Sequence, residues 1–243
     1  MKEIKSINND FIKQLCKLKD KKERYKNNEF LIEGYHLVEE AKKANILKYI
    51  LTTKTDDIYD VKSYLVTDEI IKKLSSTINP QGIIGVCQIN NKNELIGDKY
   101  LLLDNVNDPG NVGTLIRSSL GLGIDTIILS NASVDIYNEK VVRATQGALF
   151  NMNVIYRELD QAILELKEKN VTIIGTALQS SIGLQELKHY DKYAIVLGNE
   201  ANGISKEILD LADVNVRIEM QEKLESLNVT VAGSIVMYYL FTK

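Results

Sequence analysis

The chain has 243 residues, of which 44% are hydrophobic and 26% are charged, and these values are typical of a soluble globular protein. This length is sufficient for one large domain or for two of ordinary size. The formal net charge of −3 is unevenly distributed, with 17 basic against 14 acidic residues in residues 1–97 and 13 against 19 in residues 98–243.

The sequence also excludes several classes of protein. The N-terminus lacks the uninterrupted apolar core of a signal peptide, and no apolar run reaches the length of a membrane span. The two cysteines, Cys16 and Cys87, and the two histidines, His36 and His189, have no spacing typical of a zinc site or a disulfide framework. We therefore expect a cytoplasmic protein with no metal cofactor and no membrane association.

Alternating helical and extended patterns in residues 1–97 predict a small α/β domain. Helices are expected over 8–20, 35–43 and 67–74, and strands over 30–32, 46–51, 64–66 and 83–89. The polar stretch 90–99 has little hydrophobic pattern, so the domain boundary is placed within it. The predicted domains are residues 1–97 and 98–243.

The first 26 residues carry nine basic and four acidic side chains. A basic arm of this kind can bind the phosphate backbone of a nucleic acid. A lysine-rich amphipathic helix is more often a solvated face, and the residues alone leave both interpretations open. The candidates for nucleic-acid contact are Lys22, Arg24 and Lys26.

Beyond residue 97 the pattern alternates regularly between strand and helix. Strands are expected over 100–104, 126–129, 153–156, 171–175, 193–197 and 214–218, and helices over 111–120, 138–148, 160–169, 205–212 and 226–241. This alternation predicts an α/β fold with a mostly parallel sheet and helices on both of its faces.

The stretch 101–119 combines a buried strand, a turn and a helix. An apolar run at 101–103 is followed by a turn that contains Pro109 and Gly110. Asn111 is expected to cap a helix that carries Arg117 almost two turns on. Such a unit places polar side chains at the carboxyl end of a strand, where open α/β sheets bind ligands. An ordinary turn between strand and helix has the same pattern.

Two glycine-containing segments are compared with nucleotide-binding motifs. The pair Gly121 and Gly123 follows a helix and has no third glycine, so it indicates a helix C-terminus and not a dinucleotide fingerprint. The loop 198–205 has no lysine before its final hydroxyl residue, and Glu200 would repel phosphates. This loop therefore suits a neutral or cationic ligand, such as S-adenosylmethionine.

The C-terminal segment 218–232 leads into the last predicted helix. Ser226 is expected to be its N-cap, with Asn228 in its first turn. Small residues at 232–234 would let this helix approach its neighbours closely. A capped, buried helix accounts for the apolar positions but not for two outward-facing polar groups.

The three blocks 111–117, 197–205 and 218–232, in this order, resemble the motifs of the SpoU/TrmH family of RNA ribose 2′-O-methyltransferases. The resemblance covers residues 100–243. The segment 24–40 is similar to the L30e-like RNA-recognition domain of many members. The resemblance implies a deep trefoil knot in the C-terminal domain, a homodimer that uses the C-terminal helix, and methyl transfer from S-adenosylmethionine to a ribose 2′-OH of structured RNA.

The resemblance also assigns roles to residues. The donor-binding positions are Leu197, Gly198, Ile218, Leu227 and, as a secondary candidate, Thr176. The catalytic and substrate-positioning residues are Asn111, Arg117, Glu200, Ser226 and Asn228. The RNA contacts fall on Lys22, Arg24 and Lys26, with 23S ribosomal RNA favoured as the substrate. A tRNA methyltransferase and a non-catalytic RNA-binding protein are the alternatives. Glu219 stands where the family usually has proline.

The role of Arg117 has two interpretations. The family's mechanism uses this arginine to activate the ribose hydroxyl, but a guanidinium is hardly ever deprotonated in a protein. Arg117 could act as a base if a substrate phosphate shifts its proton. Otherwise it holds a phosphate next to the 2′-OH and stabilises the developing negative charge. We favour the second interpretation.

Overall fold

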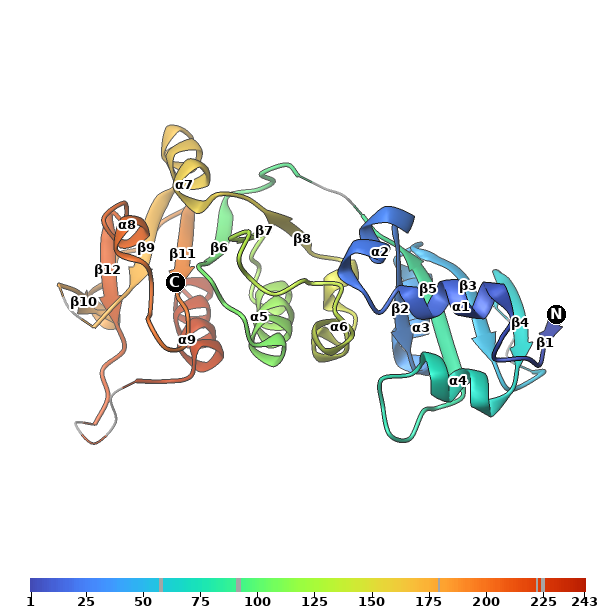
Figure 1. Cartoon of the computed structure of the whole chain (residues 1–243). Helices are drawn as coiled ribbons and strands as arrows, with labels where there is room; N and C mark the ends of the chain where they lie inside the picture. Colours follow the sequence, from blue (N-terminus) through green and yellow to red (C-terminus); the bar gives the residue numbers. More distant parts are fainter. Residues whose placement is uncertain (57–58, 91–92, 179, 222, 224–225) are drawn as a thin grey trace. The chain divides into compact units, whose positions relative to one another are not determined.

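The computed structural model describes residues 1–56, 59–90, 93–178, 180–221, 223 and 226–243. The chain forms two compact units (Figure 1). The first consists of Met1–Asn91 and Asp135–Asn151, and the second of Lys92–Val134 and Met152–Lys243. Residues 135–151, which the sequence assigns to the second domain, thus pack with the N-terminal residues. The division of function at residue 97 stays a prediction.

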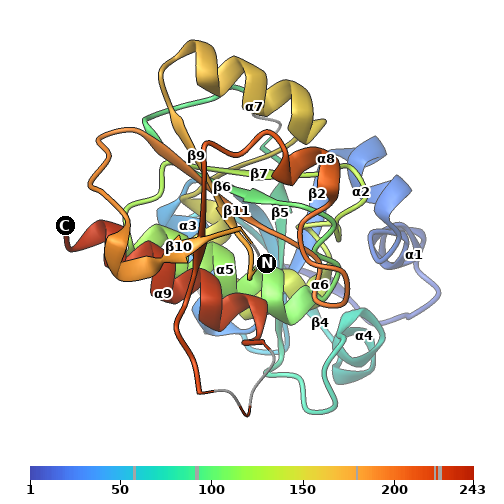
Figure 2. The same ribbon diagram turned by 90° about the vertical axis from the view of Figure 1, so that its left-hand side faces the viewer.

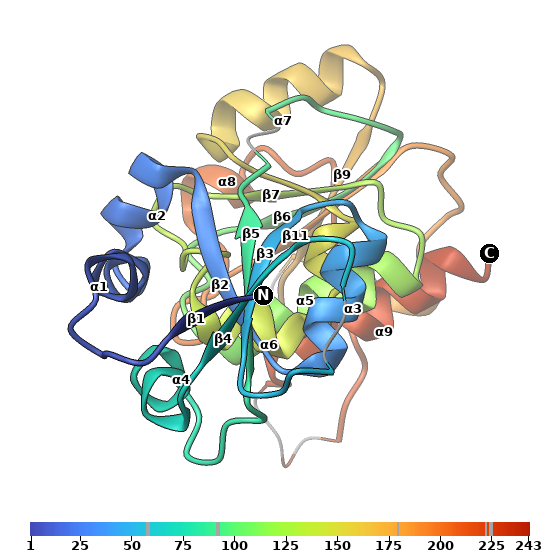
Figure 3. The ribbon, with the colours of Figure 1, turned by 90° about the vertical axis from the view of Figure 1, so that its right-hand side faces the viewer.

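The first unit contains a mixed five-stranded sheet in the order β1-β4-β3-β5-β2, with helices on both faces (Figure 3). Its elements are β1 (Lys2–Ile4), α1 (Asp10–Lys17), α2 (Lys21–Asn27), β2 (Glu29–Glu33), α3 (Tyr35–Lys43), β3 (Leu47–Thr52), β4 (Lys62–Val66), α4 (Asp68–Leu74), β5 (Ile83–Gln88), α6 (Glu139–Thr145) and the 3₁₀ turn η1 (Ala148–Phe150). Helices α1 and α4 bury Ile12, Leu15 and Ile70 against Ile84 and Val86 of the sheet.

The second unit contains a seven-stranded sheet in the order β10-β12-β9-β11-β6-β7-β8, in which every recorded strand pair is parallel. Its elements are β6 (Lys99–Leu103), α5 (Pro109–Gly121), β7 (Thr126–Leu129), β8 (Asn153–Tyr156), α7 (Leu159–Glu168), β9 (Thr172–Thr176), β10 (Ile182–Gly183), η2 (Leu184–Glu186), β11 (Tyr193–Leu197), α8 (Lys206–Leu209), β12 (Val214–Arg217) and α9 (Val229–Phe241). The predicted α/β fold with a mostly parallel sheet is confirmed.

Helices cover both faces of this sheet (Figure 2). Helices α7 and α8 lie on one face, where Ile163, Leu166 and Ile208 pack on strand residues. Helices α5 and α9 lie side by side on the other face. A Cβ at Gly233 of α9 would lie 2.5 Å from Leu197 Cδ1 and 2.9 Å from Leu115 Cδ2. The small residue therefore lets α9 approach β11 and α5 closely without displacing these two leucine side chains.

The elements that the sequence did not predict are short. Strands β1 and β10 have three and two residues, too few to establish an alternating pattern. Helix α2 is separated from α1 because Asp20 accepts hydrogen bonds from the backbone N–H groups of Lys22 and Glu23 and starts a new helix. The basic run 17–26 therefore extends over two helices.

Candidate active site

The candidate site lies where the strand order of the large sheet reverses. Strands β6 and β11 are neighbours, with Leu103 paired to Leu197. The chain continues from β6 toward β7 on one side and from β11 toward β12 on the other. Because the two loops diverge, they leave a crevice at the carboxyl ends of the strands, which is where open parallel sheets bind ligands.

A cavity of about 610 Å³ opens at this crevice, within the range of about 300–1,000 Å³ that is usual for small-molecule sites. We call it the donor cavity. It is lined by all five predicted donor-binding residues, Thr176, Leu197, Gly198, Ile218 and Leu227, which come from β9, β11 and the segments after β11 and β12. Among the described residues, its wall combines apolar side chains with loop backbone and the carboxylate of Glu200.

The loop after β11 closes back on itself next to the cavity. The backbone groups of Asn199 and Gly203 exchange two hydrogen bonds of 2.9 and 2.8 Å. A Cβ at Gly198 would lie 2.0 Å from the carbonyl carbon of Gly203 and 2.1 Å from the nitrogen of Ile204. Only glycine fits at position 198, because the two backbone segments are in direct contact there.

Asp104 and Asn199, which the sequence analysis did not identify, fix this loop. The Asp104 side chain, 4% exposed, accepts a hydrogen bond of 2.7 Å from the Ser205 backbone N–H. The Asn199 amide donates to the Asn105 carbonyl oxygen at 2.8 Å. Both residues come soon after buried strands, so their position next to β6 and β11 was the available signal. They tie the loop after β11 to the loop after β6.

Three predicted site residues form one hydrogen-bonded chain, which we call the amide relay. Asn111 Nδ2 donates to Glu200 Oε1 at 2.8 Å, and Asn228 Nδ2 donates to Asn111 Oδ1 at 3.2 Å. One residue comes from each of the three motif blocks. The relay therefore brings together segments that are 89 and 117 residues apart in the sequence.

The helix caps differ from the prediction in a way that makes the relay possible. Helix α5 begins at Pro109, and Asp108 is its N-cap, accepting from the Asn111 backbone N–H at 2.8 Å. The prediction that Asn111 caps this helix is thus wrong, and its side chain is free to bond elsewhere. Asn228, not Ser226, is the N-cap of α9, and its Oδ1 accepts from the Thr230 backbone N–H at 2.8 Å.

The remaining predicted catalytic residues take different positions. Ser226 is exposed and lines the donor cavity. Arg117 is exposed on α5, is not among the residues that line the donor cavity, and has no hydrogen-bond or ion-pair partner within the part of the chain that the structure describes. A guanidinium without an internal partner is available to bind an external anion.

Glu219 follows Ile218 where the family usually has proline. A Cβ at Gly183 would collide with the Glu219 carboxylate, so this side chain packs over the short edge strand β10. Residues 222, 224 and 225 of the third block lie outside the described residues. The trefoil knot stays a prediction.

The prediction that Arg24 contacts RNA is wrong, because this side chain is only 4% exposed and its guanidinium is occupied within the first unit. Its Nε donates to Asp135 Oδ2 at 3.1 Å, and its Nη1 donates to the carbonyl oxygens of Leu18 and Lys19 at 3.0 and 2.8 Å. A buried arginine satisfied in this way is structural. Lys22 and Lys26 are exposed on α2.

None of the described helices has the length and apolar character needed to cross a membrane. Among the residues with described positions, no three or more His, Cys, Asp and Glu side chains form a group that could hold a metal ion.

Family models and known proteins match this chain over most of its length. The model of the SpoU rRNA Methylase family matches residues 98–238, and that of the MRM3-like substrate binding domain matches residues 9–85. The chain is 38% identical over 246 residues to the 23S rRNA (guanosine(2553)-2′-O)-methyltransferase RlmP of Bacillus subtilis strain 168, covering 99% of both chains.

Solved structures extend the similarity to the whole fold. An AdoMet-bound rRNA methyltransferase from Sinorhizobium meliloti superposes with a TM-score of 0.86 at 25% identity, covering 98% of this chain and 97% of that one. A putative TrmH-family RNA methyltransferase from Porphyromonas gingivalis gives a TM-score of 0.87 at 27% identity, covering 97% and 98%. The chain belongs to the SpoU rRNA methylase family.

Proposed function

We propose that this protein transfers a methyl group from S-adenosylmethionine to a ribose 2′-hydroxyl of 23S ribosomal RNA. One observation carries the proposal. The amide relay Glu200–Asn111–Asn228 borders the donor cavity, since Glu200 and Asn228 line it. A donor pocket and a set of polar groups able to orient a ribose thus share one edge of the sheet. The similarity to a 23S rRNA 2′-O-methyltransferase and to an AdoMet-bound rRNA methyltransferase supports this choice.

The residues around the donor cavity fit S-adenosylmethionine. When bound, this molecule supplies an electrophilic methyl group on a sulfonium. Gly198 leaves backbone groups of the loop accessible, and Leu197 and Leu227 provide apolar contact area. Glu200 contributes a negative charge next to a cationic ligand, which is favourable by Coulomb attraction. Arg217 also lines the cavity, and its guanidinium can face the carboxylate of S-adenosylmethionine.

The substrate side of the site uses Arg117 and the relay. Methyl transfer needs an aligned hydroxyl oxygen: as the oxygen–carbon bond forms, the sulfur–carbon bond of the donor would break and leave a neutral thioether, and the hydroxyl proton would pass to solvent. Arg117 binds the phosphate next to that hydroxyl and stabilises the negative charge that develops on the oxygen. The amides of Asn111 and Asn228 hold the ribose in line, and Ser226 supplies a further hydroxyl at the cavity.

The active form is proposed to be a homodimer. Val231, Ile235 and Tyr238 recur at helical spacing on α9 and are 45%, 37% and 60% exposed. Together with Thr114 of α5 they border an open apolar hollow. An exposed apolar stripe of this kind is typical of a protein–protein contact. The exposed Lys22 and Lys26 of the first unit are proposed to bind RNA phosphates, and the protein to act in the cytoplasm.

A labelling assay tests the proposal. Donor carrying a tritiated methyl group is incubated with the protein and with purified 23S rRNA, 16S rRNA or tRNA that lacks the modification. We expect label in 23S rRNA, in a nucleotide that resists alkaline hydrolysis because its 2′-oxygen is blocked. Label in tRNA alone would show that the substrate is tRNA and not 23S rRNA. Donor binding without label in any RNA would favour a non-catalytic RNA-binding protein.

A further inference from the structure

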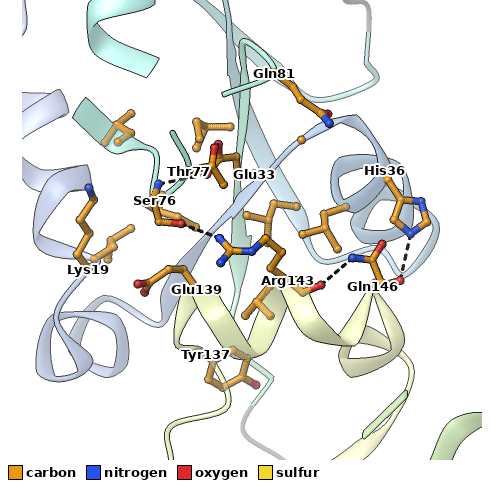
Figure 4. A pocket seen from close by; sticks show the side chains of 18 of the residues that line it. Lys19, Glu33, His36, Ser76, Thr77, Gln81, Tyr137, Glu139, Arg143 and Gln146 are labelled. Carbon is orange, nitrogen blue, oxygen red and sulfur yellow. Dashed lines mark hydrogen bonds between the residues drawn. The ribbon is translucent and has the colours of Figure 1, made fainter. Parts of the chain in front are cut away.

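A second cavity, of about 270 Å³, lies in the first unit, and none of its described lining residues also lines the donor cavity. Figure 4 shows it between β2, α3, the loop 75–81 and the segment 137–146 that contains α6. We call it the α6 cavity. It is outside the site described above, and its α6 side lies outside the residues 9–85 that match the substrate-binding domain model.

The loop side of the α6 cavity has a fixed shape. Glu33, at the end of β2, accepts hydrogen bonds from the hydroxyl of Ser75 at 2.6 Å, from the backbone N–H of Ser76 at 3.2 Å, and from the hydroxyl of Thr77. This carboxylate is therefore occupied by the loop itself. The loop in turn holds the Ser76 hydroxyl, which accepts from Arg143 Nη1 at 3.3 Å (Figure 4).

The α6 side offers unused hydrogen-bonding groups. Glu139 and Arg143 are one helical turn apart and both line the cavity. Arg143 uses only Nη1, and the Glu139 carboxylate has no partner within the described ranges. A guanidinium supplies only donors and a carboxylate only acceptors. Next to each other, the two groups match an edge that combines acceptors and donors, as the edge of a nucleobase does.

The charge and walls of the α6 cavity favour a neutral ring over a phosphate. Lys19 and Arg143 are balanced by Glu33 and Glu139, and the charge of Arg24, which also lines the cavity, is balanced by Asp135. Several aliphatic side chains contribute to the walls, namely Leu18, Leu31, Ile32, Leu37, Leu74, Ile84 and Val142. Burial raises the pKa of Tyr137 to about 12, so this lining hydroxyl is also neutral at physiological pH. The volume is slightly below the usual range of small-molecule sites and suits a single base.

We propose that the α6 cavity binds one unpaired, extruded base of the RNA substrate, read by Glu139 and Arg143; this rests on the proposed function. Unpaired bases in loops and bulges are the parts of RNA that proteins recognise by hydrogen bonds and stacking. The exposed Lys22 and Lys26 of the same unit supply sequence-independent phosphate contacts. RNA recognition thus includes a segment that follows residue 134 in the chain.

Steady-state kinetics on the full-length chain test this inference. Arg143→Ala should raise KM for 23S rRNA about tenfold, the effect of losing one good base contact, and leave KM for the donor and kcat unchanged. Arg143→Lys should raise KM for 23S rRNA by a smaller factor. Lys140→Ala is the matched control, because Lys140 is an exposed cation on the same helix that does not line the α6 cavity. Equal losses in R143A and K140A would reduce the effect to general charge and overturn the proposal.

Photocrosslinking provides an independent readout. The wild-type chain is irradiated at 254 nm with 23S rRNA, and the linked peptides and nucleotides are identified by mass spectrometry. We expect a single unpaired nucleotide linked within residues 33–37 or 137–146, with the link lost in R143A and kept in K140A. Links found only in other segments would contradict the proposal. Absence of methyl transfer would refute the proposed function separately, because the crosslink does not depend on catalysis.

Discussion

The side-chain amide of Asn111 donates to Oε1 of Glu200 at 2.8 Å, joining the first turn of α5 to the loop after β11. The side-chain oxygen of the same residue, Asn111 Oδ1, accepts a hydrogen bond from Asn228. An asparagine is suited to this position because it donates and accepts at once. A side chain with only hydrogen-bond acceptors would face the Glu200 carboxylate with no hydrogen bond between the two groups.

Asn111→Asp should therefore impair the site more than Asn111→Ala. The aspartate places a second negative charge against Glu200, and two like charges at about 4 Å repel by about 1 kcal/mol in solvent-exposed surroundings. We expect donor binding, measured by calorimetry, to weaken about fivefold in N111D, with a smaller effect in N111A. Asn107→Asp, in the same loop but outside the relay, is the control. Equal affinities in N111D and N111A would remove the electrostatic role of the contact.

Arg117→Ala should abolish methyl transfer and leave donor affinity nearly unchanged. The reason is that Arg117 is exposed and is absent from the lining of the donor cavity, as far as its described residues show. Single-turnover transfer and calorimetric donor binding measure the two properties separately. Loss of donor binding in this variant would show that Arg117 belongs to the donor site and not to the substrate side.

The pH profile of Arg117→Lys distinguishes the two roles of the arginine. A lysine has a reference pKa of about 10.4, which is well below that of arginine. If residue 117 must lose a proton, the rise of kcat with pH should move to lower pH in the variant. If it binds a phosphate and stabilises charge, the profile should keep its position and only the amplitude should fall. We expect the second result.

Much of the fold could be predicted because its elements have a clear period or a long apolar run. Helix α3 occupies residues 35–43 as predicted, and β7, β8 and β11 match their predicted ranges. The helix starts were less accurate. Pro109 is compatible with a first helical position, and Asp108 before it competes with Asn111 as the cap. Local preference alone does not decide between such residues.

The site could be predicted only as far as the three motif blocks. Position in the chain indicated which loops gather at the sheet edge, but not which side chains are buried. Arg24 and Lys22 are both basic residues in one run, yet only Arg24 meets the carboxylate of Asp135, which is 111 residues away in the sequence. A contact over that separation depends on tertiary packing, which a local pattern does not contain.

Asp104→Asn should destabilise the protein and weaken donor binding. One carboxylate oxygen would become an NH₂ group facing the Ser205 N–H or the Asn105 amide, so a buried hydrogen bond is lost. The expected cost is about 1–3 kcal/mol in the free energy of unfolding, measured by urea denaturation. Asp108→Asn is the matched control, because asparagine caps a helix as well as aspartate does. Equal stability of D104N and wild type would deny Asp104 its role in holding the loop.

The glycines at the two ends of the loop after β11 should respond differently to alanine. At Gly198 an added Cβ would lie 2.0 Å from backbone, so the loop must shift by about 1 Å. A displacement of that size can reduce an enzymatic rate by about 10²-fold, and we expect donor binding to weaken more than tenfold in calorimetry. At Gly203, which has a φ of +70°, a Cβ meets no atom within 4 Å. Gly203→Ala should cost only about 1 kcal/mol of backbone strain and retain donor affinity. If the two variants bound the donor equally well, the contact between Gly198 and the backbone at 203–204 would not shape the donor cavity.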